Sequence, residues 1–141
     1  MDRRKAGVKL SLVSDGAGVP LGAAVLPANA NDATALEPAL NKALAQAPEG
    51  RRPKRLLADR GYDSERLRRW LRDTLGIEPE IARRRTPHGS GLGRERWPIE
   101  RDFAWLGNFH RLKPRRDRLA QTFEALLTLA LSLITWRILK T

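Results

Sequence analysis

The sequence predicts a mixed α/β domain built from layers of strands and helices. Two patterns of apolar residues take turns along the chain: a period of two, typical of strands, and the spacing of helices. Such interleaving is typical of layered α/β proteins. The chain has 141 residues, enough for one domain, and 41% of them are hydrophobic, enough for a packed core.

The N-terminal segment has the pattern of a β-hairpin. Residues 8–12 alternate apolar and polar side chains, as in a half-buried strand, and residues 19–26 form a second apolar run. Residues 15–18 (DGAG) lie between them, and their two glycines supply the backbone conformations of a tight turn. We therefore expect two antiparallel strands joined at this turn.

A helix is expected after the hairpin. A polar loop at residues 29–32 precedes it, and the helix should run to about Ala47. Either Asp32 or Thr34 is the expected cap, since Thr34 and Glu37 have the spacing of a capping box.

The middle of the chain predicts a strand, a helix and a second strand. Residues 55–58 are a short apolar run that should form a buried strand with Asp59 at its C-terminal end, and Gly61 permits a sharp exit. A helix should start at residues 63–64, and residues 77–81 are the next strand. One face of this helix is apolar and consists of Leu67, Trp70, Leu71 and Leu75.

The next predicted helix follows a basic loop at residues 83–93. Pro98 suits its first turn, and Gly107 with Asn108 should end it. Its core-facing side chains are expected to be Ile99, Phe103 and Leu106.

A long helix at residues 119–139 should close the chain after a linker at residues 113–116. It is apolar on most sides, so we expect other parts of the protein to bury it as a C-terminal packing helix. Its most apolar part, residues 123–136, is shorter than the ~18 apolar residues of a membrane-spanning helix. The first residues are not followed by an apolar signal core either, so we expect a cytoplasmic, nucleoid-associated protein.

Positive charge is concentrated in the middle of the chain. The net charge is +11; residues 51–118 hold twenty basic against ten acidic residues, whereas residues 1–50 are balanced. Of the 27 basic residues 21 are arginine, whose guanidinium matches phosphate oxygens. Because a basic block attracts a polyanion through counterion release, nucleic-acid contact is favoured over a merely solvated surface.

Two carboxylates occupy positions suited to metal-dependent chemistry. Asp59 ends a predicted strand, where ligand-binding residues of α/β sheets project, and Glu100 lies early in a predicted helix. Mg²⁺ prefers carboxylate oxygens, and a pair of such ions can activate water in phosphoryl transfer. On position alone, a cap is the favoured interpretation for Asp59 and a surface ion pair for Glu100. The chain has no cysteine, which excludes thiolate zinc sites and cysteine nucleophiles.

Two segments resemble motifs of the DDE-type transposases of bacterial insertion sequences. Residues 57–64 (LADRGYDS) are similar to the second-aspartate motif of that family. Residues 96–106 (RWPIERDFAWL) and 109–112 (FHRL) resemble its glutamate motif. Residues 4–21 and the loop at 29–32 (NAND) look like the hairpin and loop between the first two acids, so the resemblance covers nearly the whole chain.

The resemblance implies a ribonuclease-H-like mixed sheet flanked by helices, in which three acids hold two Mg²⁺ (or Mn²⁺) ions against the end of the mobile element. Asp59 would be the second acid and Glu100 the third, both catalytic and both metal ligands. Arg96 matches the arginine four residues before the glutamate and would contact the DNA backbone or pair with Glu100. The tyrosine and lysine of the extended family signature are replaced here by Gly93 and Gly107.

Basic residues near the two acids are expected to bind DNA, both the ends of the insertion sequence and the target. The predicted set is Arg60, Arg83, Arg84, Arg85, Arg96, Arg101, Arg111, Arg115 and Arg116.

The first acid of the family sits on the central strand of the sheet, upstream of the hairpin, and we expect that strand to be missing from residues 1–141. Asp2 has no strand around it, and turn chemistry explains Asp15. The chain would then be a partial catalytic domain, inactive alone. It would be either the second product of a frameshifted gene, active only when fused to the part that the upstream frame encodes, or equally a decayed remnant or the result of a misplaced start. A homo-oligomer is a further expected assembly.

Two other functions compete with DNA transposition. One is a non-catalytic basic module that binds DNA or RNA, and the other is a nuclease relative acting on RNA. His88 and His110 lack zinc-site spacing, which favours phosphate contact or exposure. Trp70 and Trp105 are expected in the core, whereas Trp97 either packs there or stacks on an unpaired base.

Overall fold

A computed structural model describes residues 7–85, 92–109, 112 and 120–140, and only the backbone of residues 92–97 and 120. The elements follow one another as an alternation of strands and helices. They are β1 (Val8–Ser14), β2 (Pro20–Pro27), α1 (Asp32–Gln46), β3 (Arg55–Ala58), the 3₁₀ turn η1 (Arg60–Tyr62), α2 (Glu65–Arg69), its π-helical continuation η2 (Trp70–Leu75), β4 (Glu78–Ile81), α3 (Leu92–Leu106) and α4 (Ala120–Lys140).

The four strands form two separate pairs. Strands β1 and β2 are antiparallel, with a register that runs from Val8 opposite Pro27 to Ser14 opposite Pro20. Strands β3 and β4 are parallel, and Arg55 lies opposite Glu78. Within the described residues, no strand of one pair hydrogen-bonds to a strand of the other.

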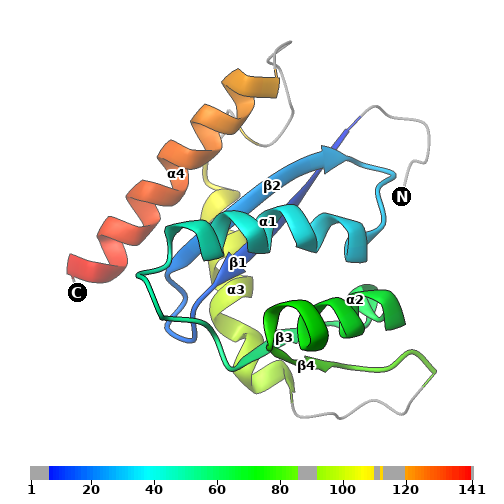
Figure 1. Ribbon diagram of the computed structural model, residues 1–141. Helices are drawn as coiled ribbons and strands as arrows, with labels where there is room; N and C mark the ends of the chain where they lie inside the picture. The colour runs from blue at the N-terminus through cyan, green and yellow to red at the C-terminus, as the bar shows by residue number, and fades with distance from the viewer. Residues whose placement is uncertain (1–6, 86–91, 110–111, 113–119, 141) are drawn as a thin grey trace.

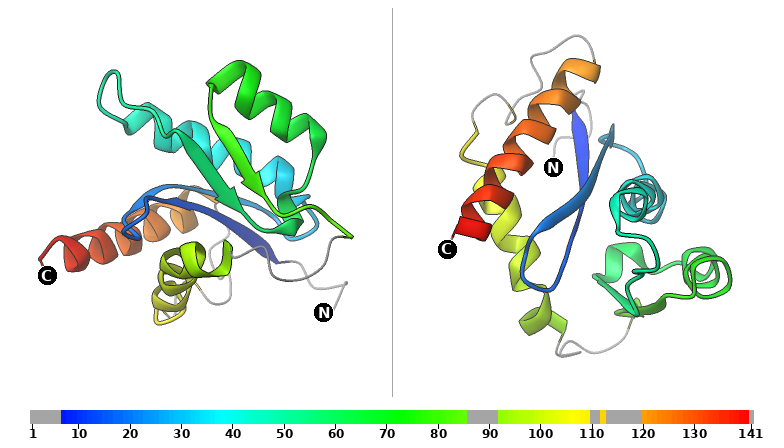
Figure 2. Two further views of the ribbon diagram at one scale, coloured as in Figure 1. Left: turned by 90° about the horizontal axis from the view of Figure 1, so that it is seen from below. Right: turned by 60° about the vertical axis from the view of Figure 1, so that its left-hand side comes forward.

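Helices cover the strands on two sides. Helices α1 and α2 lie on one side, and α3 and α4 lie on the other, in both views of Figure 2. Helix α4 lies beside the hairpin in Figure 1, away from β3 and β4. Helix α1 contacts β1, β2 and η1, and α3 contacts β1 and β3, so these two helices bridge the strand pairs. The predicted mixed α/β layering is confirmed.

Each side of the strands has its own apolar core. On one side, Leu36 and Leu40 of α1 pack with Leu67, Leu71 and Ile77 from the β3–β4 unit. On the other side the hairpin residue Leu12 packs with side chains of α3 and α4, among them Leu106, Phe123, Leu127 and Ile134. Burial of these side chains, at roughly 25 cal/mol per Å² of apolar surface, is what holds the helices to the strands.

Helix α1 is capped one residue earlier than expected. Asn31, rather than Asp32 or Thr34, is the cap, because its side chain accepts a hydrogen bond from the Ala33 amide at 2.9 Å. Asp32 is therefore inside the helix, in its first turn, where a carboxylate also interacts favourably with the helix dipole.

The limits and the buried face of α3 differ from the prediction. The helix begins at Leu92 rather than near Pro98, which lies inside it. Phe103 was expected in the core but is 41% exposed. The face that turns inward carries Pro98, Asp102 and Leu106, which repeat every four residues and so lie along one ridge.

Helix α4 is buried on one face, not all round. Its buried side chains include Phe123, Leu127 and Ile134, whereas the other face exposes Leu129, Leu133, Trp136 and Leu139. The segment Gln121–Lys140 is also long and apolar enough to cross a membrane by length and composition, contrary to our expectation from the sequence. Its buried face packs against the hairpin and α3.

Gly22 permits the close approach of α1 to β2, which makes it a test of this packing. A Cβ atom at Gly22 would lie 2.5 Å from the Ala39 carbonyl oxygen and 2.8 Å from the Ala43 amide nitrogen. Gly22→Ala should therefore lower the free energy of unfolding by about 1–3 kcal/mol in urea denaturation, because a backbone has to shift. Gly16→Ala is the matched control, since a Cβ there meets nothing within 4 Å. Equal stability of the two variants would contradict this packing.

Candidate active site

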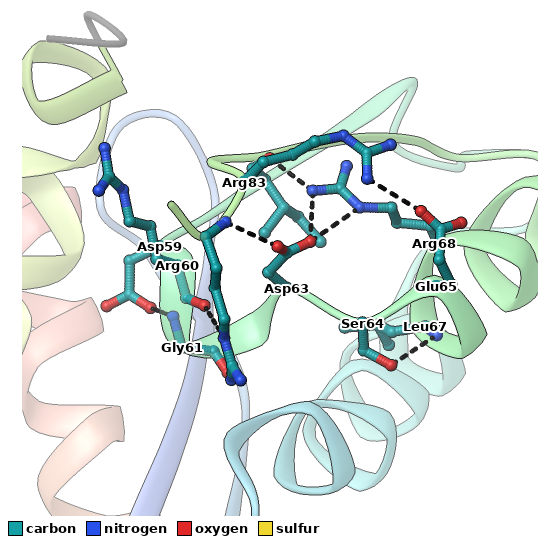
Figure 3. Close-up of polar contacts among 11 residues, drawn as sticks. Asp59, Arg60, Gly61, Asp63, Ser64, Glu65, Leu67, Arg68 and Arg83 are labelled. Atoms are coloured by element: carbon teal, nitrogen blue, oxygen red, sulfur yellow. Dashed lines mark hydrogen bonds and ion pairs between the residues drawn. The ribbon is translucent and has the colours of Figure 1, made fainter. Parts of the chain in front are cut away.

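Asp59 lies directly after β3, as predicted, and begins a tight 3₁₀ turn. Its Oδ1 atom accepts a hydrogen bond from the Gly61 amide at 2.8 Å and thereby caps η1 (Figure 3). The side chain is exposed. In Figure 3 it projects to the side opposite Asp63, so the two carboxylates of this motif serve different purposes.

Asp63 ties the start of α2 to the end of β4. It accepts hydrogen bonds from Arg68 Nη2 at 2.9 Å and from the Arg84 amide at 2.8 Å, and Arg68 also donates to the Ile81 carbonyl at 2.7 Å (Figure 3). The hydrogen bond from the Arg84 amide, followed by that from Arg68, lowers the pKa of Asp63 below its ordinary value of 3.8. The Arg68 side chain is buried, so this ion pair is structural.

The guanidinium of Arg84 holds the turn that follows Asp59. Its Nε atom lies 3.2 Å from the Arg60 carbonyl, and its Nη2 atom lies 3.3 Å from the Gly61 carbonyl. The sequence predicts that Arg84 binds DNA; two of its guanidinium nitrogens are directed at this backbone. The loop after β4 and the turn after β3 are thus held together.

A second acid, Asp32, approaches the same turn. A Cβ atom at Gly61 would lie 2.5 Å from Asp32 Oδ2 and 3.0 Å from Asp59 Oδ1, so only a glycine fits without a shift. Asp32 is paired with Lys9, whose Nζ lies 2.7 Å from Asp32 Oδ1. Sequence patterns identified Asp32 only as a helix cap, because nothing local indicates a contact with residues almost thirty positions away.

Burial and the same two carboxylates affect the pKa of the Tyr62 phenol. Burial is the main cause that raises the pKa of Tyr62 above its ordinary value of 10.0, and the carboxylates of Asp32 and Asp59 raise it further. The neighbouring Ser11 hydroxyl opposes this shift. Both carboxylates are therefore close enough to act on one ring.

Glu100 lies on α3, which packs against both β1 and β3, and its side chain is exposed. The next residue, Arg101, fixes this helix to the hairpin: its Nη2 atom donates to the Ala17 carbonyl at 2.9 Å. The same guanidinium stacks 4.7 Å from the centre of the Trp105 ring, and Arg137 of α4 also faces that ring, at 5.4 Å. Trp105 packs at the core, as expected.

The other predicted DNA-binding arginines differ in how far the structure describes them. Arg83 pairs with Glu65 at 2.9 Å, Arg60 is half-buried, and Arg85 is exposed with a left-handed backbone (φ 61°). The remaining predicted site residues lie outside the described part of the chain, or only their backbone is described. These are Arg96, Trp97, Arg111, Arg115, Arg116, His88, His110 and Asp2.

Asp15 serves the hairpin turn, as predicted. Its Oδ1 atom accepts hydrogen bonds from the amides of Ala17 and Val19, both at 2.9 Å. This is the side-chain–backbone turn that aspartate favours, and it accounts for the residue without a role in catalysis.

The described residues offer two predicted metal ligands, Asp59 and Glu100. No group of three or more His, Asp or Glu side chains among residues 7–85, 98–109 and 121–140 could hold a metal ion. Two carboxylates are a fitting but incomplete oxygen ligand set for Mg²⁺, which binds proteins through one or two carboxylates together with substrate phosphates.

Asp102 was not identified by the sequence patterns, yet it is the most unusual acid among the residues that the structure describes. Its side chain is 0% exposed, and neither carboxylate oxygen has a hydrogen-bond partner within the described residues. The closest ionic neighbour is Arg101, with Nε 3.9 Å away. Burial raises the pKa of Asp102 to about 6; Arg101 opposes the shift and Asp15 adds to it.

Comparison with known proteins identifies the family. The chain belongs to the transposase DDE domain family, which matches residues 2–135, and the resemblance seen in the motifs is thereby confirmed. It is 49% identical over 144 residues to a protein of Burkholderia cepacia named as a transposase for insertion sequence element IS402. That match covers 99% of this chain and 67% of the relative. No solved structure shows a significant match. The chain is thus a transposase domain that functions in DNA transposition.

Asp102 makes the stability of the domain depend on pH. Its pKa of about 6 in the folded state exceeds its ordinary value of 3.8, so its contribution to stability is complete below pH 3.8 and is lost as the pH rises through 6. Asp102→Asn removes this loss. The unfolding free energy of the variant relative to the native protein should therefore increase between pH 4 and pH 7, by roughly 3 kcal/mol at most.

Urea denaturation at a series of pH values measures this difference. Asp73→Asn is the control, because Asp73 is exposed on η2. Stability curves of the native protein and Asp102→Asn that run parallel from pH 4 to pH 7 would show that Asp102 is not buried in this way.

Proposed function

We propose that Asp59 and Glu100 are the second and third acids of a metal-dependent site that cuts and joins DNA phosphodiesters at the ends of an insertion sequence. The observation that carries this proposal is the position of α3. The helix that holds Glu100 packs against β3, the strand that ends at Asp59, and against β1 of the hairpin. Membership of the DDE family supports the same assignment.

Carboxylate oxygens of Asp59 and Glu100 would hold Mg²⁺ or Mn²⁺, both hard cations. Bound there, such ions activate a water and stabilise the departing oxygen of a phosphodiester. The chain itself orients the ligands. Gly61 donates to Asp59, and Arg101 anchors the helix of Glu100 to the hairpin.

The third part of the site would come from an upstream segment. Strand β1 pairs with β2 and β3 pairs with β4, and neither β1 nor β3 has a second partner strand within the described residues. A strand between β1 and β3 would join the two pairs into one five-stranded sheet of the ribonuclease-H type and would place the first acid beside Asp59. The IS402 relative, of which 67% is covered, has residues outside the match in which such a segment could lie.

The basic middle of the chain would bind the DNA. We assign phosphate contacts to the arginines that the sequence pattern singles out, which are Arg60, Arg83, Arg84, Arg85, Arg96, Arg101, Arg111, Arg115 and Arg116. Arg84 and Arg101 each also donate to a backbone carbonyl, so part of each guanidinium serves in positioning.

Asp59→Asn and Glu100→Gln test the assignment of the acids. In a transposase assembled with its upstream segment, Mg²⁺ and end-containing DNA, each substitution should lower the cleavage rate by about a hundredfold or more, since residues that only orient metal ligands already contribute about 10–100-fold. DNA affinity should be unchanged or higher, because a negative charge near phosphates is removed. Cleavage assays and salt-matched binding curves measure the two effects, with Asp73→Asn as control.

The outcomes separate this proposal from the alternatives. A non-catalytic basic module would bind DNA but cleave it in no assembly, and an RNA-directed nuclease would cleave RNA–DNA hybrids but not element ends. Cleavage by the 141-residue chain alone, abolished by Asp59→Asn, would show that no upstream acid is needed.

A further inference from the structure

The turn between Asp59 and Tyr62 is enclosed on two sides by residues distant in sequence. One side faces Asp32 at the start of α1, and the other faces Arg84 after β4. Gly61 lies at the centre of this arrangement, since its amide donates to Asp59 Oδ1 and its carbonyl accepts from Arg84. Any movement of this turn would move the carboxylate of Asp59.

Asp32 is itself held in place by Lys9 of β1. The Lys9 ammonium lies 2.7 Å from Asp32 Oδ1 and 2.6 Å from the Ala30 carbonyl, and both side chains of the pair are only partly exposed. The other oxygen, Oδ2, faces Gly61, at a distance that leaves no room for a Cβ atom. The ammonium also reduces the repulsion between the carboxylates of Asp32 and Asp59, which would otherwise tend to separate them.

The two contacts join the two strand pairs. Lys9 belongs to β1 and Asp32 to the helix packed on the hairpin, whereas Asp59 and Arg84 follow β3 and β4. The Lys9–Asp32 pair therefore positions the Asp59 turn relative to the hairpin. Arg84 positions the same turn relative to β4.

We propose that Lys9, Asp32 and Arg84 are positioning residues that hold the Gly61 turn and thereby fix the carboxylate of Asp59 for metal binding. The part that concerns metal rests on the proposed function; the part that concerns the turn does not. Residues that orient a metal ligand commonly change metal affinity by about 10–100-fold when they are removed.

The Gly61 amide resonance provides a direct readout in the ¹⁵N-labelled 141-residue chain. Because this amide donates to the Asp59 carboxylate, its proton should resonate downfield. Lys9→Met, Asp32→Asn and Arg84→Met should each move the resonance upfield. Lys42→Met and Arg69→Met are matched controls, because both side chains are exposed.

Mn²⁺ titration adds the metal readout. Paramagnetic broadening of the Gly61 resonance should require about 10–100 times more Mn²⁺ in the three variants than in the native chain or the controls. Asp59→Asn should abolish the specific broadening. Thermal unfolding of each variant shows that it is folded, and Asp32→Asn, the mildest change, suffices if another variant does not fold.

A double substitution tests the contact itself. Gly61→Ala should disturb the turn, because the new Cβ meets Asp32 Oδ2. In an Asp32→Ala background this obstacle is gone, so Gly61→Ala should then change the Mn²⁺ requirement by a smaller factor than in the native background. Equal factors in the two backgrounds would contradict the contact.

The outcomes distinguish this inference from the proposed function. If the three variants leave both the Gly61 resonance and its Mn²⁺ dependence unchanged while the native chain binds Mn²⁺ through Asp59, the positioning role is refuted and the metal site stands. If the variants move the resonance but Mn²⁺ does not broaden it in the native chain, the turn is positioned as inferred and the metal role of Asp59 fails.

Discussion

The arrangement of the site depends on the packing that joins two separate strand pairs. Within the described residues no backbone hydrogen bond links β1–β2 to β3–β4, so helices α1 and α3 carry that connection. Apolar burial is non-directional and holds the layers together. The Lys9–Asp32 pair and the Arg101–Ala17 contact are directional and fix the positions of the layers relative to one another. Asp59 and α3 both lie at this junction, which is why its geometry determines what the acids can do.

This organisation explains several features that have no obvious reason locally. Gly22 is required where α1 meets β2, and Gly61 is required where Asp32 meets the Asp59 turn, because in both places there is no room for a Cβ atom. The concentration of arginine is also explained only in part by DNA. Arg68, Arg84 and Arg101 donate to backbone carbonyls inside the protein, so a basic composition overstates the number of side chains directed at a phosphate backbone.

Local patterns predicted the strands and the position of Asp59, because alternation and turn composition depend on neighbouring residues. They did not predict the Lys9–Asp32 pair or its approach to Gly61, since long-range contacts leave no periodic signal. The start of α3 was wrong because Pro98 was taken as a first-turn residue although the helix continues before it. Phe103 was assigned to the wrong environment, and Asp102 was not identified, for a related reason. An apolar stripe through Ile99, Phe103 and Leu106 defined the predicted face of α3, whereas packing selected the ridge through Asp102 and Leu106. Helix α4 was expected to be covered, yet one apolar face is exposed.

The central claim is that Asp59 and Glu100 converge on shared divalent metal. Its most direct measurement is the anomalous scattering of Mn²⁺ in crystals of the transposase assembled with its upstream segment. The account predicts manganese peaks within about 2.0–2.6 Å of carboxylate oxygens from both residues. Manganese bound by one of the two acids, with the other side chain directed to a different face of the protein, would contradict it.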